Sequence, residues 1–111
     1  MTEKRNKYNA RKVEFKGMIF DSKKEFGQYL FLVDLEKRGK ISDLRRQVKY
    51  EILAGNVYFL PIYYIADFVF QQAGIEVIQD VKGMRKGSAY SLFKIKQKLM
   101  FDKYKIKVQE I

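Results

Sequence analysis

The sequence predicts an α/β layer fold, in which helices pack on a mixed central sheet. Three observations lead to this prediction. One segment has apolar residues at helical spacing between a helix start signal and a stop signal. Three strand-like segments then follow with only tight turns between them, which is typical of an antiparallel meander. A second helical segment and a final alternating segment complete the order of helix, three strands, helix and strand.

The first helix is predicted over Lys23–Arg38. Ser22 and Glu25 fit the capping box that opens many helices. Gly39 follows two basic residues, which favours a helix end there. The apolar residues at helical spacing are Phe26, Tyr29, Leu30 and Val33.

The chain before this helix divides into two parts. Residues 1–12 are polar and basic, and we expect them to form a basic N-terminal arm without the apolar core of a signal peptide. Val13–Phe15 and Met18–Phe20 flank a Lys-Gly pair, so they predict a short hairpin. The composition and length predict one domain over residues 13–111.

The meander is predicted from three segments, Arg46–Leu53, Tyr58–Phe70 and Ile75–Val81. The turns between them are Ala54–Asn56 and Gln71–Gly74, which contain the glycine and asparagine that tight turns favour. Because the turns are short, neighbouring strands must run antiparallel.

A second helix and a last strand are predicted at the end of the sequence. The helix spans Ser88–Asp102, and the strand spans Tyr104–Ile111. The predicted core face of the helix comprises Ala89, Leu92, Leu99 and Met100, and that of the strand comprises Ile106 and Val108.

The composition favours some classes of partner and chemistry and excludes others. The 111 residues include 23 Lys or Arg and 13 Asp or Glu, so the formal charge is +10, and nucleic acid is the partner that such a surplus favours over a merely basic surface. The chain has no His and no Cys, which excludes imidazole and thiolate chemistry and fits a reducing cytoplasm. The apolar run Val57–Phe70 is too short and too interrupted to span a bilayer, so we expect no membrane partner.

One apolar strand contains a carboxylate. The run Tyr63–Phe70 reads YYIADFVF, and an unpaired Asp67 inside it costs free energy. Asp80 and Lys82 share a face of the next strand, and the turn between the strands can bring Asp67 beside Asp80. Two adjacent carboxylates suit a hard cation such as Mg²⁺ or Mn²⁺, with Lys82 placed to stabilise charge on a phosphate.

This pattern resembles the PD-(D/E)xK nuclease superfamily through Ile65-Ala66-Asp67 and Asp80-Val81-Lys82, with Glu25 on the preceding helix. More closely, the chain is similar to a small phage-encoded family related to RecU-type Holliday-junction resolvases. The segments that carry this resemblance are Phe20–Glu25, Lys40–Leu44 with Gln47, Tyr64–Phe68 and Asp80–Gly83.

The resemblance implies a restriction-endonuclease-like core and a metal-dependent DNA endonuclease that acts on branched DNA, most specifically a four-way junction. It implies that Glu25, Asp67 and Asp80 bind Mg²⁺ or Mn²⁺ and act in catalysis with Lys82. It also implies a homodimer, since symmetric junction cutting needs two sites, and the cytoplasm of a bacterial host. Related resolvases carry a polar residue on the helix after the lysine, for which Gln97 is the candidate here.

The sequence departs from the family pattern at two places. Ala66 stands where the superfamily name has proline. The short turn at Ala54–Asn56 leaves no room for the projecting stalk with which RecU proteins hold a junction, which bears on junction preference rather than on nuclease chemistry.

Simpler explanations stand beside these assignments. Glu25 could serve only the capping box, and Asp67 could pair with Lys82 without a metal. The basic stretch on the second helix could track a phosphate backbone or form a solvated face; it comprises Lys94, Lys96 and Lys98. The alternative functions are a nuclease for duplex, flap or single-stranded DNA, and a non-catalytic DNA-binding module on a nuclease fold.

Overall fold

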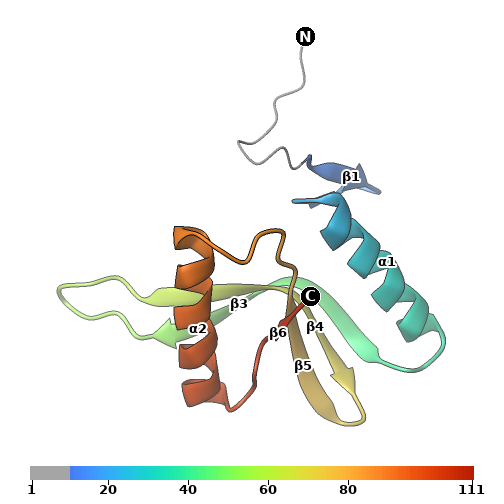
Figure 1. Ribbon diagram of the computed structural model, residues 1–111. Helices are drawn as coiled ribbons and strands as arrows, with labels where there is room; N and C mark the ends of the chain where they lie inside the picture. The colour runs from blue at the N-terminus through green and yellow to red at the C-terminus, as the bar shows by residue number, and fades with distance from the viewer. Residues whose placement is uncertain (1–10) are drawn as a thin grey trace.

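A computed structural model describes residues 11–111 of the chain. The predicted α/β class is confirmed: a mixed sheet of four strands carries two helices, and a small separate hairpin precedes the first helix (Figure 1). The elements in chain order are β1 (Val13–Phe15), β2 (Met18–Phe20), α1 (Lys23–Lys37), β3 (Ser42–Leu53), β4 (Ile62–Gln72), β5 (Ile75–Asp80), α2 (Ser88–Tyr104) and β6 (Gln109–Glu110).

The sheet has the strand order β3-β4-β5-β6. The first three strands form the antiparallel meander that the sequence predicts, and β6 lies parallel to β5. A parallel neighbour needs a crossover connection, and α2 supplies it. The predicted hairpin of β1 and β2 is confirmed as well, whereas residues 1–10 of the predicted basic arm lie outside the described residues.

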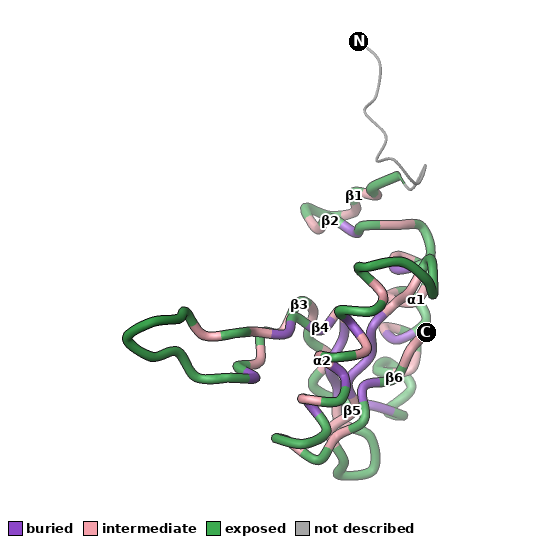
Figure 2. The backbone as a smooth tube through the Cα atoms, turned by 60° about the vertical axis from the view of Figure 1, so that its left-hand side comes forward, coloured by how far each residue is buried: buried purple, intermediate pink, exposed green. Residues whose placement is uncertain are grey.

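The connection between β3 and β4 differs from the prediction. Strand β4 begins at Ile62 and not at Tyr58, so residues 54–61 form a longer loop. Pro61 explains this start, because proline has no N–H to donate to a strand ladder. The loop extends the hairpin away from the body of the protein, and it is almost entirely exposed (Figures 1 and 2). The expectation that no segment projects here is therefore wrong.

Several other boundaries also move. Strand β3 begins at Ser42, four residues before the predicted start. Helix α2 continues to Tyr104 and ends where Lys105 adopts a left-handed backbone with φ 61°. The last strand is consequently short, since only Gln109–Glu110 pair with β5.

Two apolar clusters lie on opposite faces of the sheet. The first joins α2 to residues such as Tyr64 and Ile78, and the second joins α1 to residues such as Phe68 and Phe70. The predicted core faces of the helices are partly wrong, because Leu92 is exposed on α2. Leu30 and Ala89 are also exposed, while the buried helix residues are Glu25, Leu32, Phe93, Gln97 and Met100.

No helix among residues 11–111 is long and apolar enough to cross a membrane.

Candidate functional site

The regular alternation of side chains along strand β4 is interrupted at Asp67. In a regular strand, alternate side chains share a face. Tyr64 and Ala66 pack in the cluster under α2, yet Phe68 and Phe70, which continue the same alternation, pack in the cluster under α1. Asp67 therefore lies at the boundary between the two apolar clusters, where it is half-buried. This position explains how a carboxylate interrupts an otherwise apolar strand.

The neighbouring strand brings Asp80 next to Asp67. Phe68 pairs with Gln79 in the antiparallel β4–β5 ladder. Asp67 precedes Phe68 and Asp80 follows Gln79, so this register places the two aspartates opposite each other. The Oδ2 atom of Asp67 accepts a hydrogen bond from the backbone N–H of Val81 at 2.8 Å. The predicted juxtaposition of the two carboxylates is thus present, and it arises from the tight turn between β4 and β5.

Asp80 is buried and held by two donors. Its Oδ1 atom lies 3.1 Å from Nζ of Lys82, and its Oδ2 atom accepts a 2.7 Å hydrogen bond from the hydroxyl of Tyr64. Burial and the Asp80 charge raise the pKa of Tyr64, so its hydroxyl remains a donor. The ammonium of Lys82 also lies 3.8 Å from the centroid of the Phe93 ring. Lys82 therefore pairs with Asp80, and the alternative in which it pairs with Asp67 is wrong.

In this arrangement the ionised form of Asp67 is disfavoured. Burial and the adjacent Asp80 carboxylate raise the pKa of Asp67 to about 7, against the lowering effect of the Val81 amide. Glu25 adds further negative charge nearby. A carboxyl group that is this reluctant to ionise marks a place where positive charge would be stabilising.

Glu25 serves both the helix cap and the site. The Ser22 Oγ atom accepts from the Glu25 N–H at 3.1 Å, and the Oε1 atom of Glu25 accepts from the Asp21 N–H at 3.2 Å. The other oxygen, Oε2, faces the sheet and lies 3.6 Å from the guanidinium of Arg46. Burial raises the pKa of Glu25. The capping explanation is therefore correct but incomplete, because only one oxygen is used for it.

Gln47 connects these acids, and it is the residue whose role the sequence did not reveal. Its Nε2 atom lies 3.3 Å from Oε2 of Glu25 and 3.3 Å from Oδ1 of Asp67. Its backbone has φ 53°, although it lies within β3 between Arg46 and Val48, which pair regularly with β4. Left-handed backbone costs a non-glycine residue roughly 1–2 kcal/mol. Such strain is found where a side chain has to point in a particular direction.

Within residues 11–111, no three acidic side chains are grouped closely enough to hold a metal ion as they stand. The Gln47 amide lies between Glu25 and Asp67, which accounts for the separation of these two. The predicted ligand set of Glu25, Asp67 and Asp80 therefore stays a prediction.

The other candidates have structural partners. Gln97 is buried, and its amide donates to the Val108 carbonyl at 2.7 Å, so it connects α2 to the final segment. Lys94 pairs with Glu110 at 2.9 Å. Of the three lysines predicted on the second helix, only Lys96 lines a pocket beside Asp80.

The raised pKa of Asp67 leads to a stability prediction. Its folded pKa of about 7 exceeds the ordinary 3.8, so folding favours the protonated form, and stability is lost as pH rises from about 4 through about 7. Asp67→Asn removes this loss while keeping an oxygen that can accept from Val81. In EDTA we expect the variant to melt about 5 °C above the wild type at pH 8, and the gain to shrink at pH 5.

Thermal denaturation followed by circular dichroism at both pH values checks this expectation. Asp102→Asn is the matched control, because Asp102 is exposed on α2. An Asp67→Asn gain of the same size at pH 5 and pH 8 would show that the Asp67 charge does not strain the fold.

The comparisons with known proteins place the chain in a family. A family model described as "Protein of unknown function (DUF1064)" matches residues 5–110, so the chain belongs to the DUF1064 family. No curated protein and no solved structure gave a match. The description of this family names no activity.

Proposed function

We propose that this member of the DUF1064 family is a metal-dependent DNA endonuclease of the PD-(D/E)xK type. The observation that carries the proposal is the group formed by Asp67, Asp80 and Lys82. Two carboxylates from adjacent strands lie side by side, and a lysine two residues beyond one of them is 3.1 Å from its oxygen. This combination provides oxygen ligands for a cation together with a positive charge for a phosphate.

The arrangement of elements supports the proposal. The chain forms a helix, an antiparallel meander, a crossover helix and a parallel strand, in that order. The resemblance to the restriction-endonuclease-like core implies the same order. The acids also come from the elements that the resemblance implies, with Glu25 on the first helix, Asp67 on the central strand and Asp80 on the next.

The residues fit a hard divalent cation. All the candidate ligands are carboxylates, which Mg²⁺ and Mn²⁺ prefer. Burial and then the neighbouring Asp80 carboxylate raise the pKa of Asp67, and a bound cation would stabilise the ionised form of both carboxylates. Mg²⁺ or Mn²⁺, when bound by Asp67, Asp80 and Glu25, would supply Lewis acidity toward a water molecule and a phosphate oxygen.

The chain itself would perform the remaining tasks. In hydrolysis, a water oxygen bonds to phosphorus while the phosphorus–oxygen bond to one nucleoside breaks, and charge grows on the phosphate oxygens. Lys82 is placed to stabilise that charge. Phe93 and Asp80 hold its ammonium from two sides, so its orientation is set before substrate arrives.

The Lys82 backbone is held as well. Its carbonyl accepts from Nζ of Lys24 at 2.8 Å, and its N–H donates to the carbonyl of Ile111 at 3.0 Å. Contacts from α1 and from the end of the chain therefore fix the segment that carries Asp80 and Lys82.

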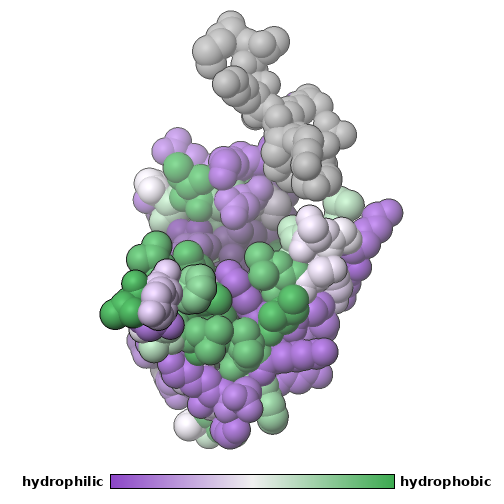
Figure 3. All heavy atoms as spheres, turned by 90° about the vertical axis from the view of Figure 1, so that its left-hand side faces the viewer, coloured by the Kyte–Doolittle hydropathy of each residue, from purple (hydrophilic) through white to green (hydrophobic). Residues whose placement is uncertain are grey.

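Branched DNA is the substrate that we propose, with a homodimer that cuts both arms of a junction. The projecting β3–β4 loop supports this choice, because the resemblance implies that RecU-type resolvases hold a junction with a projecting stalk. Residues 54–61 contain no charged side chain, and Val57 and Leu60 are 91% and 88% exposed. Such a tip suits the base faces that a branch point exposes better than it suits phosphates. Hydrophobic residues gather on this side of the molecule (Figure 3).

The proposal is tested with a labelled four-way junction and a linear duplex of the same sequence, each incubated with Mg²⁺, Mn²⁺ or EDTA. We expect paired nicks at symmetric positions in the junction, slower cutting of the duplex and no cutting in EDTA. Equal cutting of both substrates would keep the nuclease and remove the junction preference. DNA binding without cutting in either metal would instead indicate a non-catalytic DNA-binding module.

A further inference from the structure

We propose that the DNA next to the cut lies on the α1 side of the sheet, where Lys49 binds one of its phosphates. This inference rests on the proposed function, because it assigns a neighbouring part of the same substrate to residues outside the group of acids. The surface comprises Lys49, Tyr63 and Ile65, which we call the β3–β4 strip. It lies on the two strands that lead from the acids to the projecting loop (Figure 1).

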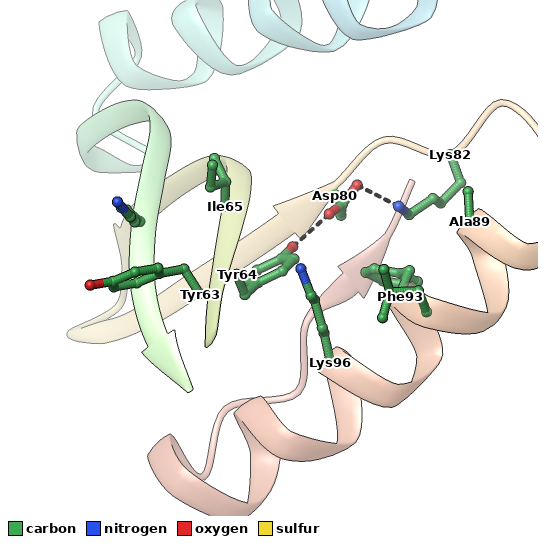
Figure 4. A pocket seen from close by; sticks show the side chains of 10 residues that line it. Tyr63, Tyr64, Ile65, Asp80, Lys82, Ala89, Phe93 and Lys96 are labelled. Carbon is green, nitrogen blue, oxygen red and sulfur yellow. Dashed lines mark hydrogen bonds and ion pairs between the residues drawn. The ribbon is translucent and has the colours of Figure 1, made fainter. Parts of the chain in front are cut away.

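The alternation of side chains places this strip on the face opposite α2. The residues that flank the strip residues pack in the cluster under α2, and they are Val48, Tyr50, Tyr64 and Ala66. Successive side chains of a strand point to opposite faces, so the strip points to the side of α1. In Figure 4 the neighbouring rings of Tyr63 and Tyr64 point in opposite directions, and only Tyr64 reaches Asp80.

Two residues of the site lie on the same face as the strip. Lys49 pairs directly with Ile65 across β3 and β4. The same register sets Gln47 opposite Asp67, two residues further along each strand. The Gln47 amide lies 3.3 Å from both Asp67 and Glu25 of α1, which places these contacts on the α1 side. The strip therefore continues the surface on which these acids lie.

Helix α1 leaves the strip open to a partner. Phe68 and Phe70 pack in the cluster under α1, but Ile65 is 52% exposed and Lys49 is exposed as well. The uncovered part of this face thus begins beside the acids, on the strands that carry the projecting loop.

The charge of the strip favours an anion. Nζ of Lys49 lies 4.0 Å from the centroid of the Tyr63 ring, which restrains the ammonium, and Lys49 has no ion pair within residues 11–111. Glu51 is the next charged residue on this face of β3, and its carboxylate lies 4.0 Å from Nζ of Lys103. The Lys49 ammonium is therefore available to a phosphate. The ring of Tyr63 and the exposed Ile65 add an apolar surface that suits the sugar beside it.

The spacing along β3 indicates which phosphate Lys49 would bind. Residues two apart in a strand are separated by about 7 Å, so Lys49 lies about that far from Gln47, whose amide contacts Asp67. Phosphates of one DNA strand follow one another at about 3.4 Å along the helix axis. The phosphate bound by Lys49 would therefore lie within about two nucleotides of the cut.

Single charge variants test this assignment. Lys49→Gln removes the charge of the strip, and Lys49→Arg keeps it. Lys98→Gln removes an exposed charge from α2 and is the matched control. Lys96→Gln removes a charge on the α2 side, where Lys96 lines a pocket with Tyr64 and Asp80 (Figure 4). Binding of a labelled DNA is measured by fluorescence anisotropy in EDTA over a range of salt concentrations, so that no cutting is required.

We expect Lys49→Gln to bind about threefold to tenfold more weakly, with a log–log salt slope that is smaller by about 1. Lys49→Arg and Lys98→Gln should keep the wild-type slope. Equal changes in Lys49→Gln and Lys98→Gln would overturn the proposal, because net charge alone would explain them. A smaller slope in Lys96→Gln with an unchanged slope in Lys49→Gln would overturn it as well, because the DNA would then lie on the α2 side.

The binding measurements also separate this inference from the proposed function. Absence of DNA binding by the wild type would overturn both. A slope change in Lys49→Gln that Lys98→Gln does not share, in a protein that never cuts DNA, would support the strip as a DNA-binding surface while removing the nuclease.

The position of the bound phosphate is tested with substrates in which one neutral methylphosphonate replaces a phosphate at increasing distance from the mapped cut. Wild-type binding should weaken several-fold when the neutral linkage lies within about two nucleotides of the cut. Lys49→Gln should be almost insensitive to the replacement at that position. Equal effects on both proteins at every position would overturn the assignment, because Lys49 would then contact no phosphate near the cut.

Discussion

Asp80→Asn is expected to reduce DNA cutting by on the order of 10²–10³-fold or more, while DNA affinity is kept or slightly increased. Cutting falls because the variant loses the carboxylate that faces both Asp67 and Lys82. Affinity does not fall, because the change removes a negative charge from a site that phosphates approach. Single-turnover cutting and anisotropy with the same labelled DNA measure the two effects separately.

Asparagine is a better replacement than alanine at this position. The Tyr64 hydroxyl is buried and donates to Asp80, and an asparagine oxygen can still accept that hydrogen bond. Asp80→Ala would leave the hydroxyl without an acceptor, which costs about 1–3 kcal/mol of folding stability. We therefore expect Asp80→Ala to melt several degrees below the wild type. A loss of cutting in that variant could then come from partial unfolding as well as from the missing carboxylate. Asp102→Asn controls for the change of charge, and full activity in Asp80→Asn would remove Asp80 from the catalytic group.

Lys82→Met is expected to lower the maximal cutting rate by on the order of 10²–10³-fold, with a small effect on KM. Methionine keeps the length and the apolar packing of the lysine stem against Phe93, and it loses the charge that would stabilise the phosphate. The effect should therefore fall on kcat and not on binding.

Two comparisons make the Lys82 result specific. Lys98→Met removes an exposed lysine from α2 and should cut at the wild-type rate. Lys82→Arg should recover only part of the activity, because a guanidinium has a different shape and presents its charge differently. Wild-type rates in Lys82→Met would assign this lysine to pairing with Asp80 alone.

Local signals in the sequence were sufficient to predict several elements and one part of the site. The capping box at Ser22 and the glycine at Gly39 bracket α1, and the helix lies between them as predicted. The alternation of a strand places Asp80 and Lys82 on one face, and they form an ion pair there. These predictions depend on residues within a few positions of one another, where backbone geometry alone decides the outcome.

The structural features that the sequence did not predict depend on contacts between segments that are far apart in the sequence. The sequence pattern of α2 suggested Leu92 as a core residue, but the helix instead buries Phe93, against Tyr64 of β4. The change of face at Asp67 could not be read from an apolar run, because it depends on which helix covers each half of the strand. Pro61 was the one local sign that β4 starts late, and its missing N–H gives the reason.

Gln47 shows why the full site was not predictable. Gln47 is among the residues that carry the family resemblance, but no local pattern gives it a role. Its importance lies in a left-handed backbone and in contacts to Glu25 and Asp67. Its amide donates to two acids at the point where a cation is proposed to bind. The left-handed backbone of Gln47 thus directs this amide toward Glu25 and Asp67, which no local sequence pattern predicts.

The nicking of supercoiled plasmid in Mn²⁺ tests the nuclease assignment most sensitively, because one cut in thousands of bonds changes the mobility of the whole molecule. Wild-type protein and Asp80→Asn are purified in the same way and compared with and without EDTA. We expect that the wild type converts the plasmid to nicked circles, that EDTA prevents this conversion and that Asp80→Asn leaves the plasmid supercoiled. Equal nicking by both proteins, or no nicking by either, would contradict the assignment of Asp67, Asp80 and Lys82 as a nuclease site.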